Sequence, residues 1–239
     1  MQRHLKLYSA EAKHKQQESN IVGFYKLVKR LFDIICALLG LVISSPFWLF
    51  AMIGIEVSDP GPIFYIANRV GKDNKTFKMF KFRSMRQGKV NEAVFRGDED
   101  RIFPFGKFIR ATKIDELPQL LNILMGSMSL VGPRPAAVDQ LCVVRAGKYN
   151  IASKVTAGLT GPSALYDYIY GDTVEDAAEY EEKVLPTRLE LDVYYVEHMS
   201  FCYDIKMIWY TFVCVLASVF HKEPKRIFRE LLKAAKDVK

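Results

Sequence analysis

The longest uncharged stretch of the chain is an apolar run of 22 residues, Ile34 to Ile55. A helix of that length, rising about 1.5 Å per residue, reaches about 33 Å and would cross the hydrocarbon core of a bilayer. Ser45 and Pro46 lie in its middle. Proline removes a backbone donor and predicts a kink, while serine hydroxyls can satisfy the freed carbonyl groups. Three interpretations follow: a straight span, a helix-break-helix that re-enters its own leaflet, and a helix buried in a soluble core.

A short β-hairpin is predicted soon after this run. Two β-rich segments flank the sequence Gly71-Lys72-Asp73-Asn74, which is typical of a hairpin loop. Because side chains alternate between the faces of a strand, Lys81 and Arg83 are expected on one face of the second strand. That face would carry positive charge.

The rest of the pattern is mostly helical. Residues 173–200 predict one or two helices with a break near Pro186. The uncharged part of the next segment, Met207 to Phe220, has 14 residues, too few to span a bilayer but suited to an interfacial or core helix. Residues 221–239 predict a basic amphipathic helix. Together these patterns indicate an α+β fold that is mostly helical and contains a small β-hairpin.

The sequence KIDELPQLLNILMGSMSLVGPRP combines helix signals with a pair of acids. Proline is favoured at a helix start and glycine at its end, so Pro118 and Gly126 predict a helix over Gln119–Met125. Asp115 and Glu116 would then lie just before the helix N-terminus, where the helix dipole favours ionised carboxylates. The plainest interpretation is that they cap the helix. Ionised carboxylates can also serve as a nucleophile, a metal ligand or a base.

Basic side chains surround these acids in the sequence. Arg110 precedes them, and Arg134 follows in GPRP, where flanking prolines restrict the backbone and hold the guanidinium outward. Arginine presents a rigid fork suited to phosphate. We therefore predict that substrate phosphates are bound by Lys81, Arg83, Arg110 and Arg134, although a solvated face remains the alternative for the lysine. The acids would hold Mg²⁺ or attack phosphorus, while the cations offset phosphate charge.

Composition points to an anionic partner. The 239-residue chain has a formal net charge of +7, and half of its residues are hydrophobic. Its four cysteines and four histidines are scattered, so neither a zinc site, a disulfide framework nor a histidine-based catalyst is indicated. No P-loop or Rossmann motif follows a strand. The glycine–proline loops VGPRP and AGLTGP are candidates to approach a phosphate through their backbone. Nucleic acid is not an expected partner, because no recognition helix or RNA motif is present.

Several stretches resemble the monotopic phosphoglycosyl transferases, the bacterial sugar transferases that initiate lipid-linked glycan assembly. They occur in the family's order between about residues 25 and 219, and they are KRLFDIICALLGLVISSPFWL, GPIFYIANRVGKDNKTFKMFKFRSM, FGKFIRATKIDELPQLLNILMGSMSLVGPRP, AGLTG and LELDVYYVEHMSFCYDIKMI. The block from the acid pair to GPRP is long and specific.

The resemblance implies an activity and roles for several residues. Members transfer a sugar-1-phosphate from a UDP-sugar to polyprenyl (undecaprenyl) phosphate, release UMP and require Mg²⁺. Asp115 matches the covalent nucleophile, which forms an aspartyl-phosphosugar, and Glu116 matches its acidic neighbour; both are expected at the metal. Ser45 and Pro46 match the break that makes the membrane helix re-enter. Arg30 would lie near phospholipid head groups.

The implied organisation is that of a monotopic membrane protein on the cytoplasmic face of the bacterial inner membrane. It would comprise a polar N-terminal tail (1–23), a re-entrant membrane helix (24–57), a cytosolic catalytic domain with interfacial helices (58–220) and a basic amphipathic C-terminal helix (221–239). The glycan assembled could be an exopolysaccharide, a capsule, an O-antigen or a glycoprotein glycan. Membrane lipids and a second copy of the chain, forming a homodimer, are further expected partners.

The chain departs from the commonest family pattern after AGLTG. Many members continue with a tryptophan-containing stretch that includes an arginine near the nucleotide, whereas here the continuation is PSALYDYIYGD. We therefore assign no residue to the nucleobase or the sugar. The alternative function is a non-catalytic, membrane-anchored binder of phosphorylated ligands, in which the acids are helix caps.

Overall fold

The computed structural model describes residues 2–86, 101–174, 176–220 and 222–238, and it is mostly helical with two small sheets. The α-helices are α1 (Gln2–Ser58), α2 (Pro104–Ala111), α3 (Gln119–Met125), α4 (Leu141–Val144), α5 (Pro162–Ile169), α6 (Ala177–Glu179), α7 (Leu185–His198), α8 (Phe201–Val219) and α9 (Lys225–Lys236). The strands are β1 (Phe64–Val70), β2 (Thr76–Phe82), β3 (Ser129–Val131), β4 (Ala136–Ala137) and β5 (Gly158–Thr160). Short 3-10 or π-helical turns are η1 (Lys72–Asn74), η3 (Ile114–Glu116), η4 (Gly147–Lys154), η5 (Gly171–Thr173) and η6 (Tyr180–Val184). The predicted α+β class is confirmed.

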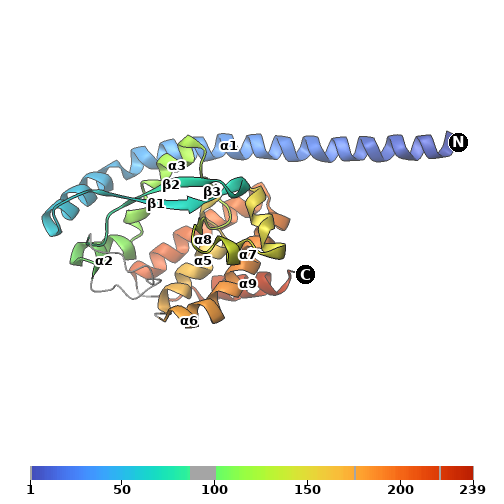
Figure 1. Ribbon diagram of the computed structural model, residues 1–239. Helices are drawn as coiled ribbons and strands as arrows, with labels where there is room; N and C mark the ends of the chain where they lie inside the picture. Colours follow the sequence, from blue (N-terminus) through green and yellow to red (C-terminus); the bar gives the residue numbers. More distant parts are fainter. Residues whose placement is uncertain (1, 87–100, 175, 221, 239) are drawn as a thin grey trace.

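Helix α1 extends along one side of the molecule, and its N-terminal part projects beyond the other elements (Figure 1). It begins at Gln2, so the predicted limit between a tail and a membrane helix at residues 23 and 24 falls inside a continuous helix. Pro46 also lies within it, and the ribbon changes direction in its second half (Figure 1). The predicted break is therefore a bend in a helix that stays helical on both sides.

Ser45 explains how the helix continues past the proline. Pro46 has no N–H to donate to the carbonyl four residues earlier, which is that of Val42. The Ser45 hydroxyl donates to this carbonyl oxygen at 2.8 Å. Because the freed carbonyl finds a partner within its own helix, the bend leaves no unsatisfied backbone acceptor in an apolar segment.

The two faces of α1 differ in side-chain size. Ala37, Ser44 and Ala51 face the rest of the protein and are buried. Added Cβ atoms at Gly40 and Gly54 would lie 3.2 Å from the Leu120 side chain and 2.1 Å from the Phe105 ring, so α1 packs closely there. Most large apolar side chains of α1 lie outward, although Ile55 is buried in the core. Those at least half exposed are Leu27, Leu31, Ile35, Leu38, Leu39, Val42, Ile43, Phe47, Leu49, Ile53 and Val57, with Phe50 just below half. Small residues inward and large apolar residues outward are typical of a helix solvated by lipid.

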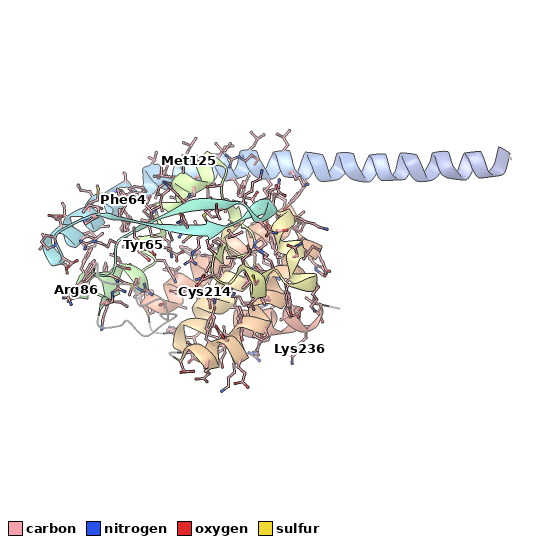
Figure 2. All side chains as sticks on the ribbon, viewed as in Figure 1. Phe64, Tyr65, Arg86, Met125, Cys214 and Lys236 are labelled. Carbon is pink, nitrogen blue, oxygen red and sulfur yellow. The ribbon has the colours of Figure 1, made fainter. Side chains whose placement is uncertain are left out.

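The predicted hairpin is confirmed. β1 and β2 pair antiparallel from Phe64 with Phe82 to Val70 with Thr76, and η1 forms the loop at the predicted position. β4 pairs with the other edge of β1, and β3 and β5 form a separate parallel pair. Phe64 and Met125 are exposed and lie on elements that pack against α1 (Figure 2), so they extend the outward apolar surface of that helix. Tyr65 is also exposed, but as the next residue of the strand it lies on the opposite face of β1.

Helix α3 has its predicted limits. It follows Pro118 and ends at Gly126, whose φ of 83° is the left-handed conformation that glycine adopts readily. Asn122 is fully buried and joins α3 to β2: its Nδ2 donates to Lys78 O at 2.7 Å, and Phe80 N donates to its Oδ1 at 2.9 Å. These two bonds fix the residues before α3 beside the end of β2.

The C-terminal helices α5, α7, α8 and α9 pack around one core, which includes Leu165, Leu191, Tyr195, Met207 and Leu231. The predicted break near Pro186 is not an interruption of the helix: helical conformation continues from α6 through the π-helical turn η6 into α7, and Pro186 lies in the first turn of α7. The predicted C-terminal helix is α9, whose apolar residues pack into this core.

Buried Asp204 ties α8 to α1. It accepts hydrogen bonds from Lys29 Nζ at 2.7 Å, Tyr25 OH at 3.0 Å and Tyr195 OH at 2.8 Å. Within the described residues, both Tyr25–Ser58 and the 19-residue α8 are long and apolar enough to cross a membrane. The prediction concerned only the 14 uncharged residues from Met207 to Phe220, whereas the whole helix reaches this length because it begins at Phe201. Asp204 and Lys206 belong to the helix and have ion-pair partners, Lys29 and Glu230.

Candidate active site

The two acids lie in η3, a single helical turn between α2 and α3. Lys113 precedes them in a left-handed conformation, with a φ of 58°, and turns the chain out of α2. Asp115 is 6% exposed, and its Oδ1 accepts no hydrogen bond from the residues that the structure describes. Glu116 accepts a hydrogen bond from Lys81 Nζ at 2.9 Å. A buried carboxylate oxygen without a donor is costly and calls for a functional explanation.

Helix capping does not provide that explanation. The N-cap of α3 is Pro118, which makes no side-chain bond to the helix. Among the described residues, Glu116 Oε1 accepts from Lys81 and Asp115 Oδ1 has no donor, so neither of these oxygens caps α3. The geometry therefore favours the chemical interpretation of the pair over the capping one.

The surroundings separate the pKa values of the two carboxyls. Burial raises the pKa of Asp115 to about 6, helped by the charge of Glu116 and opposed by Lys81, Lys113 and Arg110. Burial also acts to raise the pKa of Glu116, but Lys81, with Lys113 and Arg134, outweighs it and holds this pKa well below its usual range. Glu116 is therefore a permanent anion, whereas Asp115 titrates near neutral pH, a pattern found in acid pairs with divided roles.

Three of the four predicted phosphate-binding cations lie near the pair. Lys81 contacts Glu116, and the charge of exposed Arg110 acts on Asp115. Arg134 acts on Glu116, and its Nη2 lies 3.1 Å from Asp167 Oδ2. Its side chain is 38% exposed, so part of it reaches the surface. These positions agree with the predicted cluster of cations around two acids.

Arg83 lies elsewhere. Its side chain is buried, its guanidinium bonds to the carboxylate and the backbone oxygen of Asp59, and it lies 5.6 Å from the ring centroid of Phe103. The predicted alternation would have put Arg83 beside Lys81, but β2 ends at Phe82, so the strand geometry does not extend to it. The structure brings Lys81, not Arg83, to the acids, and gives the expected phosphate contact of Arg83 no support.

The two glycine–proline loops pack against each other. Gly132 N donates to Thr160 O at 2.9 Å, and Gly158 N donates to Pro133 O at 2.8 Å. A Cβ added to Gly158 would lie 2.1 Å from Gly132 N. The glycines of VGPRP and AGLTGP thus permit close contact between the ends of β3 and β5, which supports the backbone of Arg134, and the expected backbone approach to phosphate finds no support here.

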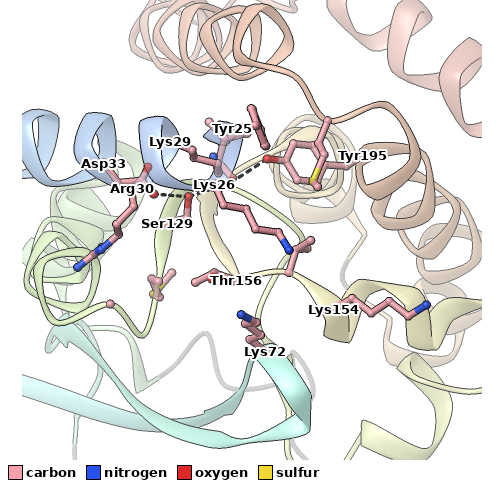
Figure 3. A pocket seen from close by; sticks show the side chains of 15 residues that line it. Tyr25, Lys26, Lys29, Arg30, Asp33, Lys72, Ser129, Lys154, Thr156 and Tyr195 are labelled. Atoms are coloured by element: carbon pink, nitrogen blue, oxygen red, sulfur yellow. Dashed lines mark hydrogen bonds between the residues drawn. The ribbon is translucent and has the colours of Figure 1, made fainter. Parts of the chain in front are cut away.

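Arg30 lies at the other end of α3 from the acids. Its guanidinium donates to Ile123 O at 2.6 Å and Leu124 O at 2.8 Å, the carbonyls of the last turn. Beside it is a cavity of about 220 Å³ beneath α1, into which Lys26 and Lys72 are directed from opposite sides (Figure 3). Arg30 therefore fastens α1 to α3 within a basic pocket, at the point where the apolar outward face of α1 begins.

The two acids provide the number of carboxylates that a Mg²⁺ site usually takes from a protein. No group of three His, Cys, Asp or Glu side chains is arranged for a metal anywhere in the described ranges. Mg²⁺, however, is usually bound by one or two carboxylates together with substrate phosphates and water. Glu116 and Asp115, one oxygen of which has no partner among the described residues, fit that smaller requirement.

Sequence reasoning did not identify Asp167, Tyr168 or Asp192. Asp192 Oδ1 accepts from Arg134 N at 3.1 Å, and Lys113 Nζ lies 4.4 Å from the ring centroid of Tyr168. These residues meet the site across 33 to 58 positions of sequence, for example 58 between Arg134 and Asp192. The one available signal was the unusual stretch PSALYDYIYGD, which contains both Asp167 and Tyr168.

The site thus consists of a buried, titratable carboxylate beside a permanently ionised one, with cations around both. It belongs to a domain that packs against α1, a helix whose outward face is apolar. Comparison with known proteins identifies the family to which a chain with this site belongs. The chain belongs to the bacterial sugar transferase family, which it matches over residues 24–218. It is therefore a member of an enzyme family.

Named relatives are similar over most of the chain. It is 36% identical over 199 residues, 81% of its length, to the UDP-glucose:undecaprenyl-phosphate glucose-1-phosphate transferase of Escherichia coli (strain K12), of which it covers 41%. It is 35% identical over 198 residues, 80% of its length, to the UDP-N-acetylgalactosamine-undecaprenyl-phosphate N-acetylgalactosaminephosphotransferase of Aeromonas hydrophila, of which it covers 44%. The chain thus spans less than half the length of these two relatives. It covers 98% of the uncharacterized sugar transferase EpsL of Bacillus subtilis (strain 168), to which it is 34% identical over 212 residues, 89% of its own length.

Proposed function

We propose that this protein transfers a sugar-1-phosphate from a UDP-sugar to a polyprenyl phosphate such as undecaprenyl phosphate, releases UMP and so initiates assembly of a membrane-linked glycan. The observation that supports this most strongly is the acid pair: Asp115 is buried with one oxygen that no described residue bonds, and Glu116 is held by Lys81. Relatives whose names include these two substrates support the same reaction.

In the first step, an ionised oxygen of Asp115 attacks the phosphorus that carries the sugar. The bond between this phosphorus and the bridging oxygen of the diphosphate breaks, and the oxygen leaves with the electron pair as part of UMP. The product is an aspartyl-phosphosugar. An attack by one anion on another is opposed by charge repulsion, which the positive charges of Arg110, Arg134 and Lys113 offset.

In the second step, a phosphate oxygen of the polyprenyl acceptor attacks the same phosphorus. The bond to Asp115 breaks, its electron pair returns to the carboxylate, and a polyprenyl diphosphate sugar is released. Splitting one transfer in this way lets the soluble donor and the lipid acceptor use the site in turn.

Asp115 and Glu116 are the residues that would hold Mg²⁺. Bound there, the ion would supply positive charge against the phosphate oxygens. Glu116 fits this role because its low pKa keeps it ionised, and it also holds Lys81 beside the reacting groups.

We further propose that α1 anchors the protein on the cytoplasmic face of the bacterial inner membrane by entering and leaving the same leaflet. The bend within α1, the Ser45 hydroxyl bond to Val42 and the large apolar side chains on the outward face support this arrangement. Arg30 and the lysines of the basic pocket lie where the apolar face begins, so they would be at the depth of lipid head groups.

The re-entrant arrangement predicts that both ends of the apolar part of α1 are reached from one side. Single cysteines at Gly23 and Val57, introduced after replacement of the four native cysteines, should both be labelled by an impermeant maleimide in inverted vesicles and neither in intact cells. Both positions are exposed, so reactivity reports membrane side rather than burial. Labelling of the two positions from opposite sides would establish a straight span.

The pKa of about 6 predicts how the first step depends on pH. Protonation removes the nucleophile, so the rate of the acceptor-free UMP burst should be constant above pH 7 and fall about tenfold per unit well below pH 6. Omitting the acceptor keeps its own phosphate titration out of the profile. In Lys81→Met the inflection should move to higher pH, because Lys81 lowers the pKa of Asp115. A burst rate that is flat from pH 5 to 8 would show that the Asp115 carboxylate does not titrate near pH 6 in the site loaded with donor and Mg²⁺.

The activity itself is tested by incubating purified protein in detergent with undecaprenyl phosphate, Mg²⁺ and each member of a panel of UDP-sugars. We expect UMP release with at least one donor and loss of this release on chelation by EDTA. A non-catalytic binder of phosphorylated ligands would bind the donors and release no UMP.

A further inference from the structure

We infer that helix α5 positions the cations of the phosphate site: Asp167 orients Arg134 and the adjacent Tyr168 orients Lys113, so that the donor diphosphate binds between them. This inference rests on the proposed function and adds to it a role for the segment that departs from the commonest family sequence. This segment is PSALYDYIYGD, residues 162–172.

Arg134 is held at both of its ends. Its backbone N donates to Asp192 Oδ1 at 3.1 Å, and its Nη2 lies 3.1 Å from Asp167 Oδ2. Ser163, also on α5, donates to the same oxygen of Asp192 at 2.5 Å. Helix α5 therefore supports both carboxylates that fix Arg134, and a long side chain with many rotamers is restricted to one direction.

Asp167 is itself rigidly placed. Its side chain is 3% exposed, its Oδ1 accepts from Tyr180 OH at 2.6 Å, and Arg188 Nη1 donates to that hydroxyl at 2.7 Å. A carboxylate buried to this degree does not reach a substrate directly. It acts through Arg134, whose side chain is 38% exposed, and it is therefore a positioning residue.

The neighbouring position supports the second cation. Lys113 Nζ lies 4.4 Å from the ring centroid of Tyr168, within the range of a cation–π contact. Lys113 is two residues before Asp115, and both Lys113 and Arg134 lie close enough to Glu116 to lower its pKa. Two consecutive residues of α5 thus contact two cations that flank the acid pair.

Double-mutant cycles test the inference, because a residue that acts through another loses its effect when that other residue is absent. Asp167→Asn should lower kcat/KM for the UDP-sugar about tenfold or more, and add little in an Arg134→Ala background. Tyr168→Leu should behave in the same way against Lys113→Met, whereas Tyr168→Phe keeps the ring and should retain most activity. Asp176→Asn is the matched control: this exposed N-cap of α6 is replaced by an equally good cap, so kcat/KM should not change.

Affinity for uridine diphosphate, measured by calorimetry, provides a readout without turnover. Asp167→Asn should weaken binding several-fold in protein that remains folded, as shown by a cooperative thermal unfolding transition. The inference is overturned if the losses of kcat/KM in the two single variants multiply in the double variant. It is also overturned if Asp167→Asn and Tyr168→Leu have the same kcat/KM as an active wild type. If Asp167→Asn does not fold, the Tyr168 and Lys113 cycle decides the question. Wild type that releases no UMP from any donor would instead refute the proposed function.

Discussion

Asp115→Asn is expected to reduce UMP release by roughly a thousandfold or more, because the amide has the shape of the carboxylate but cannot form the covalent intermediate. The fold should be retained. Burial raises the pKa of this carboxyl, so the ionised form is disfavoured in the folded protein, and a neutral side chain should leave the unfolding temperature unchanged or raise it. Loss of activity together with unimpaired stability is the pattern expected of a functional residue kept at a cost in stability.

The matched control is Asp73→Asn in the hairpin loop. Asp73 is exposed and has a φ of 55°, a conformation that asparagine also tolerates. This variant should release UMP at the wild-type rate. Asp115→Asn protein that does the same would remove Asp115 from the mechanism.

Gly158→Ala is expected to have the largest effect on stability. The new Cβ would lie 2.1 Å from Gly132 N and 2.5 Å from Thr160 O, both of which are backbone atoms held in the β3–β5 pair. Neither can move without breaking the bonds between the two glycine–proline loops, so we expect a loss of about 3 kcal/mol or more, or failure to fold. Thermal unfolding in detergent measures this.

Gly23→Ala is the comparison for that substitution. Gly23 lies in α1 with no heavy atom within 4 Å of an added Cβ, so alanine should be neutral or should stabilise the helix by about 0.5–1 kcal/mol. If Gly158→Ala unfolds at the same temperature as Gly23→Ala, the close contact between the loops is not as tight as described.

Local signals in the sequence predicted local structure well. The limits of α3 follow from Pro118 and Gly126, whose conformational preferences act within a few residues. The hairpin followed from its loop residues, and the bend in α1 from Ser45 and Pro46, for the same reason. Each of these predictions depends on neighbours in the chain.

Partners distant in sequence could not be predicted in this way. The packing of separate elements decides whether Arg83 contacts a phosphate or Asp59. It also decides whether Asp167 holds Arg134. The ion pair of Asp204 in α8 was not predicted either, because its partner Lys29 lies on α1, 175 residues away. The acid pair was identified from its position before a helix, but its partly unsatisfied burial required the three-dimensional structure.

The central claim is that the Asp115 carboxylate forms a bond to phosphorus. The most direct measurement is the intact mass of the protein after incubation with a UDP-sugar it uses, in the absence of polyprenyl phosphate, followed by peptide mapping. We predict an added mass of one sugar phosphate on the peptide that contains Asp115, removed when the acceptor is supplied and absent from Asp115→Asn. Acceptor-dependent UMP release without any such adduct, or an adduct on another residue, would contradict the account.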